Sequence, residues 1–578
     1  MKTAIRVQVL QFLIAASFAA LSLGLFQTQI IKGGYFRRSS EQNRIRLIRL
    51  EAPRGNIFDR NGVLLATSRP AYNVYAIPED FNPKDIPTIG HILELPETEI
   101  RKRLSQARTA SFTPILLKQD ISKEISMQIE ERRPGLSGIF IQIGMIRTYP
   151  FKEVGAHTIG YIGKISKEEY QTLDPSIYRF DAWIGRSGIE RVFDSRLRGE
   201  DGGRQLEVDA RGVPISLLSE KEPELGGDVH LSLDSKLEDR IKPLLSHRRS
   251  VVLVMDLKTG ELLAAVSTPG FDPNIFVTPS QNAERLSVIG SKDHPLLDRG
   301  LNGLYPPGSV FKLVTAIAAL EAGLITPHTT FECPGYFRLS PRSRRFKCWF
   351  SEGHGRVDLY TALERSCNVY FYNTGRLLGE KKLSEYARKL GFGASPVFEL
   401  PAASGLVPSA DWKKERYHDN WYQGETVTFA IGQSYLLVSP FQILRLVAAI
   451  ATNGQMFQPK LIKSSDGNLE TEKNKQKIEI REETFRTLRQ GMLQAVSSDR
   501  GTGQLARVNF AKLAGKSGTA QAPPGDAHAW FSGFFPYEDP KFAFVVFVER
   551  GKSGGITAAQ IAKRIVYFCK DIYGSAVL

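Results

Sequence analysis

Three short patterns of hydroxyl, amine and amide side chains follow one another in the second half of the chain. They are Ser309-x-x-Lys312, Ser366-Cys367-Asn368 and Lys516-Ser517-Gly518-Thr519. In the first, a Pro-Pro-Gly turn leads into an apolar run that predicts a buried helix from Ser309 to Glu321, and positions three apart on a helix are neighbours. Burial disfavours an ammonium, so a neutral Lys312 is expected to be the base that activates Ser309 for acyl transfer.

Chance alone produces S-x-x-K about once or twice in a chain this long, so the first pattern gains weight from its two companions. A rival for the third pattern, Lys258-Thr259-Gly260, precedes the serine and lies in a predicted hairpin turn within residues 250–267. We therefore assign the third role to the later Lys-Ser-Gly-Thr segment.

Each remaining position has an expected task in acyl transfer through a serine ester. Ser366 is expected to relay a proton to the leaving amine, and Asn368 to hold the substrate backbone. The two N–H donors that a tetrahedral oxyanion needs are expected to be the backbone amides of Ser309 and Thr519.

The third segment is expected to bind the substrate's end. Lys516, with the hydroxyls of Ser517 and Thr519, suits a C-terminal carboxylate, and Gly518 lies between them. A peptide acid is therefore the predicted substrate.

The elements around these patterns indicate an α+β fold. Residues 250–267 read as a β-hairpin, 541–550 as a central strand covered on both faces, and the last apolar segment as a helix with Cys569 in its core. Earlier in the chain, 71–77 has a strand pattern and 122–134 a helical one. The catalytic part is thus expected to be an antiparallel sheet sandwiched by helices, with a helical subdomain.

The N-terminus predicts a single membrane anchor. No charged residue occurs between Arg6 and Lys32, a stretch long enough at ~1.5 Å per residue to cross ~30 Å of hydrocarbon. A cleaved signal peptide is the alternative, although no clear small-x-small site follows. We expect a tail (1–6), an anchor (7–31), a non-catalytic region (32–226) and a catalytic domain (227–578), the last boundary near the charged stretch 219–228.

Besides these motifs, four longer segments resemble a known protein family, and together they extend along nearly the whole chain. They are "RGNIFDRNG" (54–62), "GRSGIERVFDSRLRG" (185–199), "DLKTGELLAAVSTPGFDPN" (256–274) and "WYQGETVTFAIGQSYLLVSPFQ" (421–442). With the three patterns they resemble the class B penicillin-binding proteins, and most closely the elongation-type members. The third motif reads K-S-G where K-T-G is commoner, a change that keeps the hydroxyl.

The resemblance implies a bacterial D,D-transpeptidase of the inner membrane, with its catalytic domain on the periplasmic side and a pedestal at 32–226. Implied partners are stem peptides ending in D-Ala-D-Ala, β-lactams, the bilayer and a membrane glycosyltransferase. The net charge of +15 alone selects no partner, and nucleic acid is not expected across the membrane. Alternatives are a protein that mainly activates the glycosyltransferase, a division-type transpeptidase, and a β-lactam sensor or hydrolase.

Three cysteines and a histidine lie between and within these motifs, spaced C-x14-C-x5-H-x12-C. They are Cys333, Cys348, His354 and Cys367. Three thiolates and an imidazole form a closed set for structural zinc, and some relatives carry zinc at this spacing. Outside the cytoplasm, a Cys333–Cys348 disulfide with a free Cys367 is an alternative, as are unconnected thiols. The basic loop 338–347 between the ligands is expected to be solvated.

Overall fold

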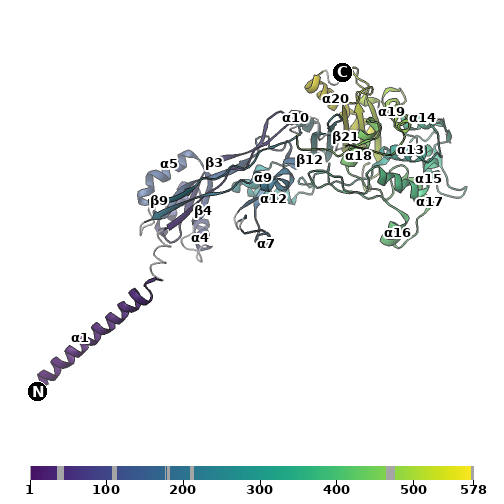
Figure 1. Ribbon diagram of the computed structural model, residues 1–578. Coiled ribbons are helices and arrows are strands. Elements are labelled where there is room, and N and C mark those ends of the chain that lie inside the picture. The colour runs from purple at the N-terminus through teal and green to yellow at the C-terminus, as the bar shows by residue number, and fades with distance from the viewer. Residues whose placement is uncertain are drawn as a thin grey trace. The chain divides into compact units, whose positions relative to one another are not determined.

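The computed structural model (Figure 1) describes residues 2–34, 45–106, 114–175, 177–178, 182–208, 214–245, 247–463 and 475–574. Contacts divide the chain into two compact units, each assembled from segments far apart in sequence. The first contains Met1–Gly55, Ser68–Ile146 and Arg198–Gly227; the second contains Asn56–Thr67, Arg147–Leu197 and Asp228–Leu578. The predicted pedestal, 32–226, contributes to both units, and its boundaries stay a prediction.

The N-terminal segment is one long apolar helix. α1 (Lys2–Phe26) continues into a π-helical turn at Gln27–Ile31. The span Ala4–Ile31 has 28 residues, an 18-residue stretch with a mean hydropathy of 2.1, and no buried residue. At ~1.5 Å per residue it is about 42 Å long, enough by length and composition to cross a bilayer. The hydroxyls of Ser17 and Thr28 donate to helix carbonyls at 2.9 Å and so expose no unmet donor to lipid.

Besides α1, the first unit contains strands from both ends of its sequence and three further α-helices among the described residues. Its three-stranded antiparallel sheet has the order β1-β8-β9, while β3 pairs with β4 and β5 elsewhere in the unit. The predicted strand 71–77 falls in β3, and the predicted helix 122–134 is α5, which the Ser122 hydroxyl caps. The elements are β1 (Ile45–Leu50), β3 (Leu64–Ala76), α3 (Ile86–Leu93), α4 (Glu97–Gln106), β4 (Ile115–Ile121), α5 (Lys123–Arg132), β5 (Ile139–Thr148), β8 (Gly202–Val208) and β9 (Pro214–Lys221).

The second unit begins with short elements before its main sheet. They are β2 (Ile57–Phe58), which runs parallel to β10 (Val229–His230), α6 (Ala156–Ile159), β6 (Ile162–Lys164), α7 (Lys167–Tyr170), β7 (Trp183–Gly185), α8 (Gly188–Val192) and α9 (Asp194–Leu197). A fully buried ion pair, Arg147–Glu190 at 2.6 Å, holds this region together. Because each partner neutralises the other, removal of one alone would leave a buried unpaired charge and is expected to lower the free energy of unfolding.

The main sheet of the second unit has five antiparallel strands in the order β12-β11-β21-β20-β19. They are β11 (Ser250–Asp256), β12 (Leu262–Thr268), β19 (Ala514–Ala520), β20 (His528–Phe535) and β21 (Phe542–Val548). Every residue of β21 is buried, which confirms the predicted central strand, and β11 with β12 confirms the predicted hairpin. β19 lies at an edge.

Helices cover both faces of this sheet. Val545 and Phe547 belong to the core shared with α13 (Lys312–Glu321) and α18 (Pro440–Ala451), whereas Phe544 and Val546 belong to the core shared with α10 (Ser235–Leu245) and α20 (Ala559–Tyr573). This alternation follows from the two-residue period of a strand. The predicted α+β class is confirmed.

The helical subdomain surrounds α13. Its other elements are α14 (Leu359–Glu364), α15 (Asn368–Lys389), α16 (Ala410–Tyr417), α17 (Gln423–Phe429), α19 (Glu482–Ser497), and the strand pairs β13 (Phe331–Cys333) with β16 (Gly355–Val357), β14 (Tyr336–Phe337) with β15 (Phe346–Lys347), and β17 (Gln455–Phe457) with β18 (Lys475–Lys477). Two further helices, α11 (Asn274–Val277) and α12 (Asn282–Gly290), follow β12. The subdomain therefore lies between β12 and β19 in sequence and carries the first two motifs.

Candidate active site and metal centre

Ser309 lies in a tight turn immediately before a buried helix. The prediction that the α-helix begins at Ser309 is wrong, because Gly308–Val310 forms a 3-10 turn and α13 begins at Lys312. Gly308 has φ 54°, its N–H donates to Gly432 O at 2.9 Å, and a Cβ there would lie 2.8 Å from Thr519 O. Glycine thus allows the turn to approach β19, and it leaves Ser309 half-buried.

The amine of Lys312 is fully buried and donates to the second motif. Its Nζ lies 2.7 Å from Ser366 O, 3.2 Å from Ser366 Oγ and 2.8 Å from Asn368 Oδ1. Ser366 has φ 54°, a left-handed conformation that a serine rarely adopts. Strain of this kind gathers at functional sites, where the surrounding structure enforces it.

A second buried amine reaches the same hydroxyl from the sheet. Lys516 Nζ on β19 lies 3.0 Å from Ser366 Oγ and 2.9 Å from Ser517 O. Burial lowers the pKa of Lys312 to about 8, against the opposing effect of the nearby thiols, and burial together with Lys312 lowers the pKa of Lys516 well below its usual value. The Lys312–Ser366–Lys516 cluster can therefore accept and pass a proton near neutral pH.

The remaining third-motif residues lie on β19, the edge strand of the sheet, where Ser517 and Gly518 are buried. Ser517 Oγ donates to Thr502 Oγ1 at 2.9 Å, and Thr519 is exposed, its Oγ1 accepting from Gly554 N at 3.2 Å. At Gly518 a Cβ would lie 2.8 Å from Val310 Cγ2, so this position must stay small. An edge strand beside Ser309 can pair with an extended peptide.

The predicted catalytic and binding residues therefore converge, although they come from four separate elements. The sequence analysis missed Thr502. Its contact with Ser517 arises from tertiary folding, and no local pattern indicates it. The N–H of Thr502 also donates to Glu364 O at 3.1 Å. The roles predicted for the individual residues stay predictions.

The Cys/His set also comes together. The ligand atoms of Cys333, Cys348, His354 and Cys367 lie within 4.8 Å of one another, and His354 Nδ1 is 3.5 Å from the sulfurs of both Cys333 and Cys348. Tetrahedral coordination with usual zinc bond lengths requires an S···N separation of about 3.6 Å, so the set fits a metal ion. All four cysteines of the chain are free thiols, and the Cys333–Cys348 disulfide considered as an alternative to zinc is not formed.

The electrostatics of the set favour a bound cation. Burial opposes protonation of His354, but contacts with the sulfurs of Cys333 and Cys348 outweigh it and raise the pKa of His354 to about 9. Contacts with Cys333 and Cys367 lower the pKa of the Cys348 thiol. Contacts with Cys333 and Cys348 raise the pKa of the Cys367 thiol, and the ligand types of the set suit a metal ion.

The Cys/His set borders the second motif. Cys367 separates Ser366 from Asn368, and Asn368 Nδ2 donates to Lys347 O at 3.2 Å, one residue before Cys348. The arginines between the ligands are exposed, as predicted, with Arg344 stacked on Phe346 and Arg345 on Tyr336. Cys569 lies apart in the core of α20, as predicted.

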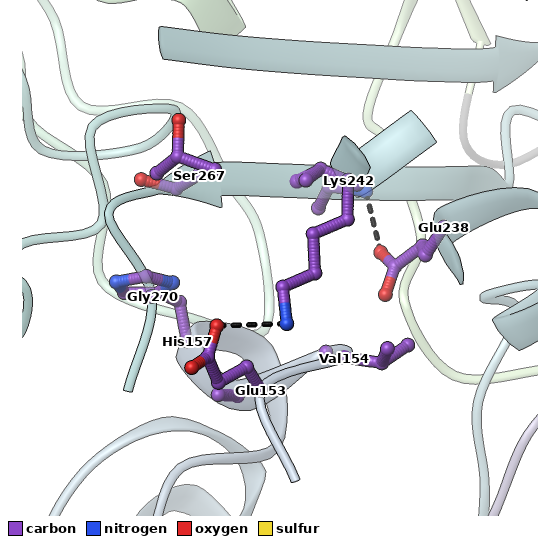
Figure 2. A pocket seen from close by; sticks show the side chains of 12 residues that line it. Glu153, Val154, His157, Glu238, Lys242, Ser267 and Gly270 are labelled. Carbon is purple, nitrogen blue, oxygen red and sulfur yellow. Dashed lines mark hydrogen bonds and ion pairs between the residues drawn. The ribbon is translucent and has the colours of Figure 1, made fainter. Parts of the chain in front are cut away.

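A separate polar pocket lies between α10 and β12 (Figure 2). Glu238 is buried there, its Oε1 accepts from Ala265 N at 2.8 Å, and burial raises its pKa to about 7. At the mouth Lys242 pairs with Glu153 at 2.7 Å. None of its lining residues belongs to the three motifs, so we assign the pocket no part in acyl transfer.

Comparisons with known proteins agree with this geometry. A family model described as the penicillin binding protein transpeptidase domain matches residues 250–567, and one described as the penicillin-binding protein dimerisation domain matches 49–231. Peptidoglycan D,D-transpeptidase MrdA of Acinetobacter baumannii is 33% identical over 561 residues, covering 93% of this chain and 83% of that protein.

Two solved structures are similar over most of the chain. PBP2 of Helicobacter pylori, solved as a complex with MreC, has a TM-score of 0.81 and 28% identity, covering 91% of this chain and 99% of that one. A chain of a peptidoglycan synthase complex, solved to describe the coordination of polymerization and crosslinking, has a TM-score of 0.73 and 28% identity, covering 99% of both chains.

Proposed function

This chain belongs to the penicillin-binding-protein transpeptidase family, and from that premise we propose how its residues cross-link peptidoglycan. It is an elongation-type, serine-dependent D,D-transpeptidase and a β-lactam target. The observation that carries the residue assignment is the buried Lys312–Ser366–Lys516 cluster beside the Ser309 turn.

In the first half-reaction, Ser309 Oγ attacks the carbonyl carbon of the penultimate D-Ala of a stem peptide. The hydroxyl proton passes to neutral Lys312, the C–N bond of the terminal D-Ala breaks, and Ser366 relays a proton to that leaving amine. In the second half-reaction, an acceptor amine attacks the ester, the C–Oγ bond breaks and the proton returns to Oγ. Splitting one amide exchange in two lowers each barrier.

The edge of β19 is assigned to the donor peptide. Lys516 and the hydroxyls of Ser517 and Thr519 receive its carboxylate, and the N–H groups of Ser309 and Thr519 stabilise the oxyanion. In other acyl-transfer enzymes one such donor is worth about 2.7–4 kcal/mol. The close approach of Gly308 to Thr519 O supports this pairing.

The metal we assign to the Cys/His set is zinc, in a structural role. Its support is the closed Cys₃His ligand set and the 3.5 Å sulfur–nitrogen separations. When bound, zinc joins the loops that bear its ligands and supplies no open coordination position. Cys333, Cys348 and His354 then anchor Cys367, which orients Ser366 and Asn368.

The remaining assignments concern the whole protein. We place it in the bacterial inner membrane through residues 7–31, with residues 227–578 on the periplasmic side and 32–226 as a pedestal for partners. The pedestal's support is the dimerisation-domain match and the similarity to a chain solved with MreC. Activation of a membrane glycosyltransferase is a second function, which similarity to a polymerizing and crosslinking complex favours.

One reconstitution separates the two functions. Wild type and Ser309→Ala are combined with an elongation glycosyltransferase and lipid-linked disaccharide pentapeptide, and the products are digested and analysed by mass spectrometry. Wild type is expected to give cross-linked dimers and the variant none. Equal glycan polymerisation by both proteins supports a separate activating role, whereas cross-links made by the variant would refute the assignment of Ser309.

A further inference from the structure

A basic cleft opens at the end of the main sheet, on the second unit. It has a volume of about 460 Å³, and its wall comes from the segment before β11 and the segment after β21. We define the basic cleft by the charged residues Arg248, Arg249, Glu549, Arg550 and Lys552. The wall thus carries four cationic side chains and one carboxylate.

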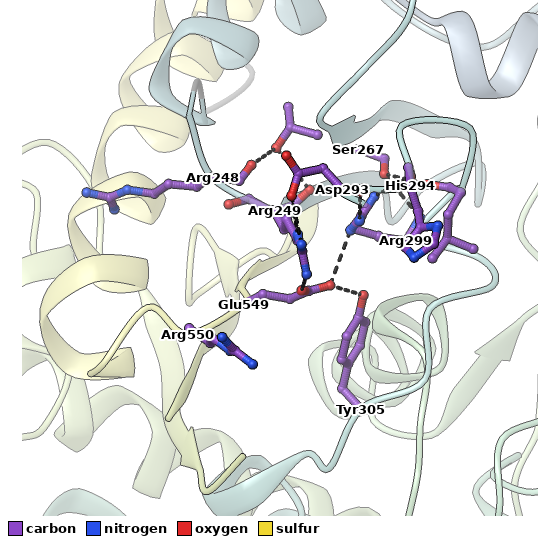
Figure 3. Close-up of polar contacts among 12 residues, drawn as sticks. Arg248, Arg249, Ser267, Asp293, His294, Arg299, Tyr305, Glu549 and Arg550 are labelled. Atoms are coloured by element: carbon purple, nitrogen blue, oxygen red, sulfur yellow. Dashed lines mark hydrogen bonds and ion pairs between the residues drawn. The ribbon is translucent and has the colours of Figure 1, made fainter. Parts of the chain in front are cut away.

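The single carboxylate is already neutralised (Figure 3). Glu549 accepts from Tyr305 OH at 2.7 Å and from Arg299 Nε at 3.2 Å, and lies 3.4 Å from Arg249 Nη1. Arg249 also pairs with Asp293 at 2.7 Å. This internal network leaves the other cations of the wall unused.

Three cations face solvent without an acidic partner. Arg248, Arg550 and Lys552 are exposed, and within the described ranges of the chain no carboxylate pairs with their side chains. Because like charges gathered in a concave site focus a positive potential, the basic cleft attracts anions. Arginine suits carboxylates in particular, since its planar fork donates two parallel hydrogen bonds.

The backbone that carries two of these cations is strained. Arg550 has φ 51° and Lys552 has φ 68°, the left-handed region that disfavours side chains with a Cβ. Hydrogen bonds enforce it: Arg550 N donates to His528 Nδ1 at 3.1 Å and Lys552 N to Ala527 O at 2.9 Å. The structure therefore holds two exposed cations in a fixed, unfavourable conformation, a pattern typical of binding sites.

The basic cleft is bonded to both catalytic elements. From Lys552 the chain runs two residues to Gly554, whose N–H donates to Thr519 Oγ1 at 3.2 Å. On the other side, Tyr305, which contacts Glu549, precedes Ser309 by four residues in the same segment. Arg550 also lies over the loop that follows the third motif, since a Cβ at Gly525 would be 3.3 Å from its guanidinium carbon.

We propose that the basic cleft binds free carboxylates of the acceptor stem peptide. This inference rests on the proposed transpeptidase function and deepens it, because the second half-reaction requires a second peptide whose amine reaches the acyl-Ser309 ester. That amine forms the new C–N bond while the C–Oγ bond breaks and its proton returns to Oγ. Charge at the basic cleft holds the acceptor peptide but takes no part in acylation.

The test compares two synthetic acceptor peptides with the same amine, one ending in a free carboxylate and one in an amide. Full-length protein in detergent micelles is acylated with a thioester donor, and transfer to each acceptor is followed by mass spectrometry. Wild type is expected to have a lower KM for the carboxylate peptide. The double variant Arg550→Asn/Lys552→Asn, in which asparagine tolerates the left-handed backbone, is expected to raise that KM about tenfold and to leave the KM of the amide peptide unchanged.

Two variants guard against a folding defect. Arg248→Gln, on the opposite wall, is expected to reduce the preference for the carboxylate peptide over the amide peptide. Arg564→Gln, which changes an exposed arginine on α20, is expected to leave that preference intact. High salt is expected to weaken the wild-type preference, because the Debye length shrinks from ~10 Å at 0.1 M to ~3 Å at 1 M.

The outcomes separate this inference from the proposed function. Normal acylation with an unchanged carboxylate preference in both cleft variants overturns the inference alone, whereas absence of any Ser309 adduct on folded wild type overturns the function itself. If the cleft variants lose binding to anionic vesicles but keep the preference for the carboxylate peptide, the inference is overturned and the cleft is assigned to lipid headgroups.

Discussion

At the scale of single residues, the site is organised around the charge state of two lysines. Lys312 and Lys516 are both fully buried and share the Ser366 hydroxyl at 3.2 and 3.0 Å. Burial lowers the pKa of Lys312 to about 8, and burial together with the charge of Lys312 lowers the pKa of Lys516 well below its usual value. One amine is thereby available as a base without any histidine.

This charge state predicts the pH dependence of acylation. The neutral form of Lys312 is the active one and burial lowers its pKa to about 8, so the rate of acylation by benzylpenicillin should rise about tenfold per pH unit below 8 and level off above it. The measurement is the rate of adduct formation by mass spectrometry between pH 6 and 9.5. Lys312→Arg keeps the charge but cannot lose its proton, and should be slower by a factor of about 10² to 10⁴. A rate that falls as pH rises would contradict the role of Lys312.

At the scale of elements, the Cys/His set brings together the ends of four elements. Cys333 ends β13, Cys348 follows β15, His354 precedes β16 and Cys367 caps α15. These strands have two or three residues each and are too short to be stable alone. The set therefore cross-links strands that also contribute Phe337, Phe346 and Val357 to the hydrophobic core.

Metal removal is accordingly expected to damage both stability and acylation. We expect one zinc per chain by elemental mass spectrometry, and its loss after chelation or in His354→Ala should lower the melting temperature by several degrees and slow acylation of Ser309. Cys569→Ala, which removes a buried cysteine outside the set, should keep the metal. Metal-free wild type that acylates at the normal rate would show that the set does not support the second motif.

Sequence patterns predicted the elements whose cause is local. The hairpin around Lys258-Thr259-Gly260 and the buried run of β21 follow from turn chemistry and apolar periodicity. The helix start at Ser309 was misplaced because the 3-10 turn depends on distant contacts of Gly308 with Gly432 and β19. Thr502, Glu238 and the basic cleft had no local signal, since only tertiary packing brings their partners together.

At the scale of the whole molecule, one apolar helix and two compact units account for the chain. The span Ala4–Ile31 has no buried residue, so it contributes no packing to either unit. Contact of this exposed apolar surface with water is unfavourable. The helix is therefore stable only in lipid or detergent. Anchoring and catalysis should therefore be separable.

Deletion of residues 1–34 tests that separation. The truncated protein is expected to lose flotation with lipid vesicles and to keep its acylation rate within about twofold, since no residue of the span is buried. A full-length variant with Leu13→Asp serves as the matched control, because a charge at the centre of the span costs about 2.5–3.5 kcal/mol on insertion. Truncated protein that still floats would indicate a second membrane-binding surface.

The most direct test of the central claim is the intact mass of the full-length protein after incubation with benzylpenicillin, measured beside Ser309→Ala. The account predicts one persistent adduct on the wild type, located on the peptide that contains Ser309, and none on the variant. An equal adduct on Ser309→Ala, or no adduct on folded, metal-replete wild type, would contradict the assignment of Ser309 as the nucleophile.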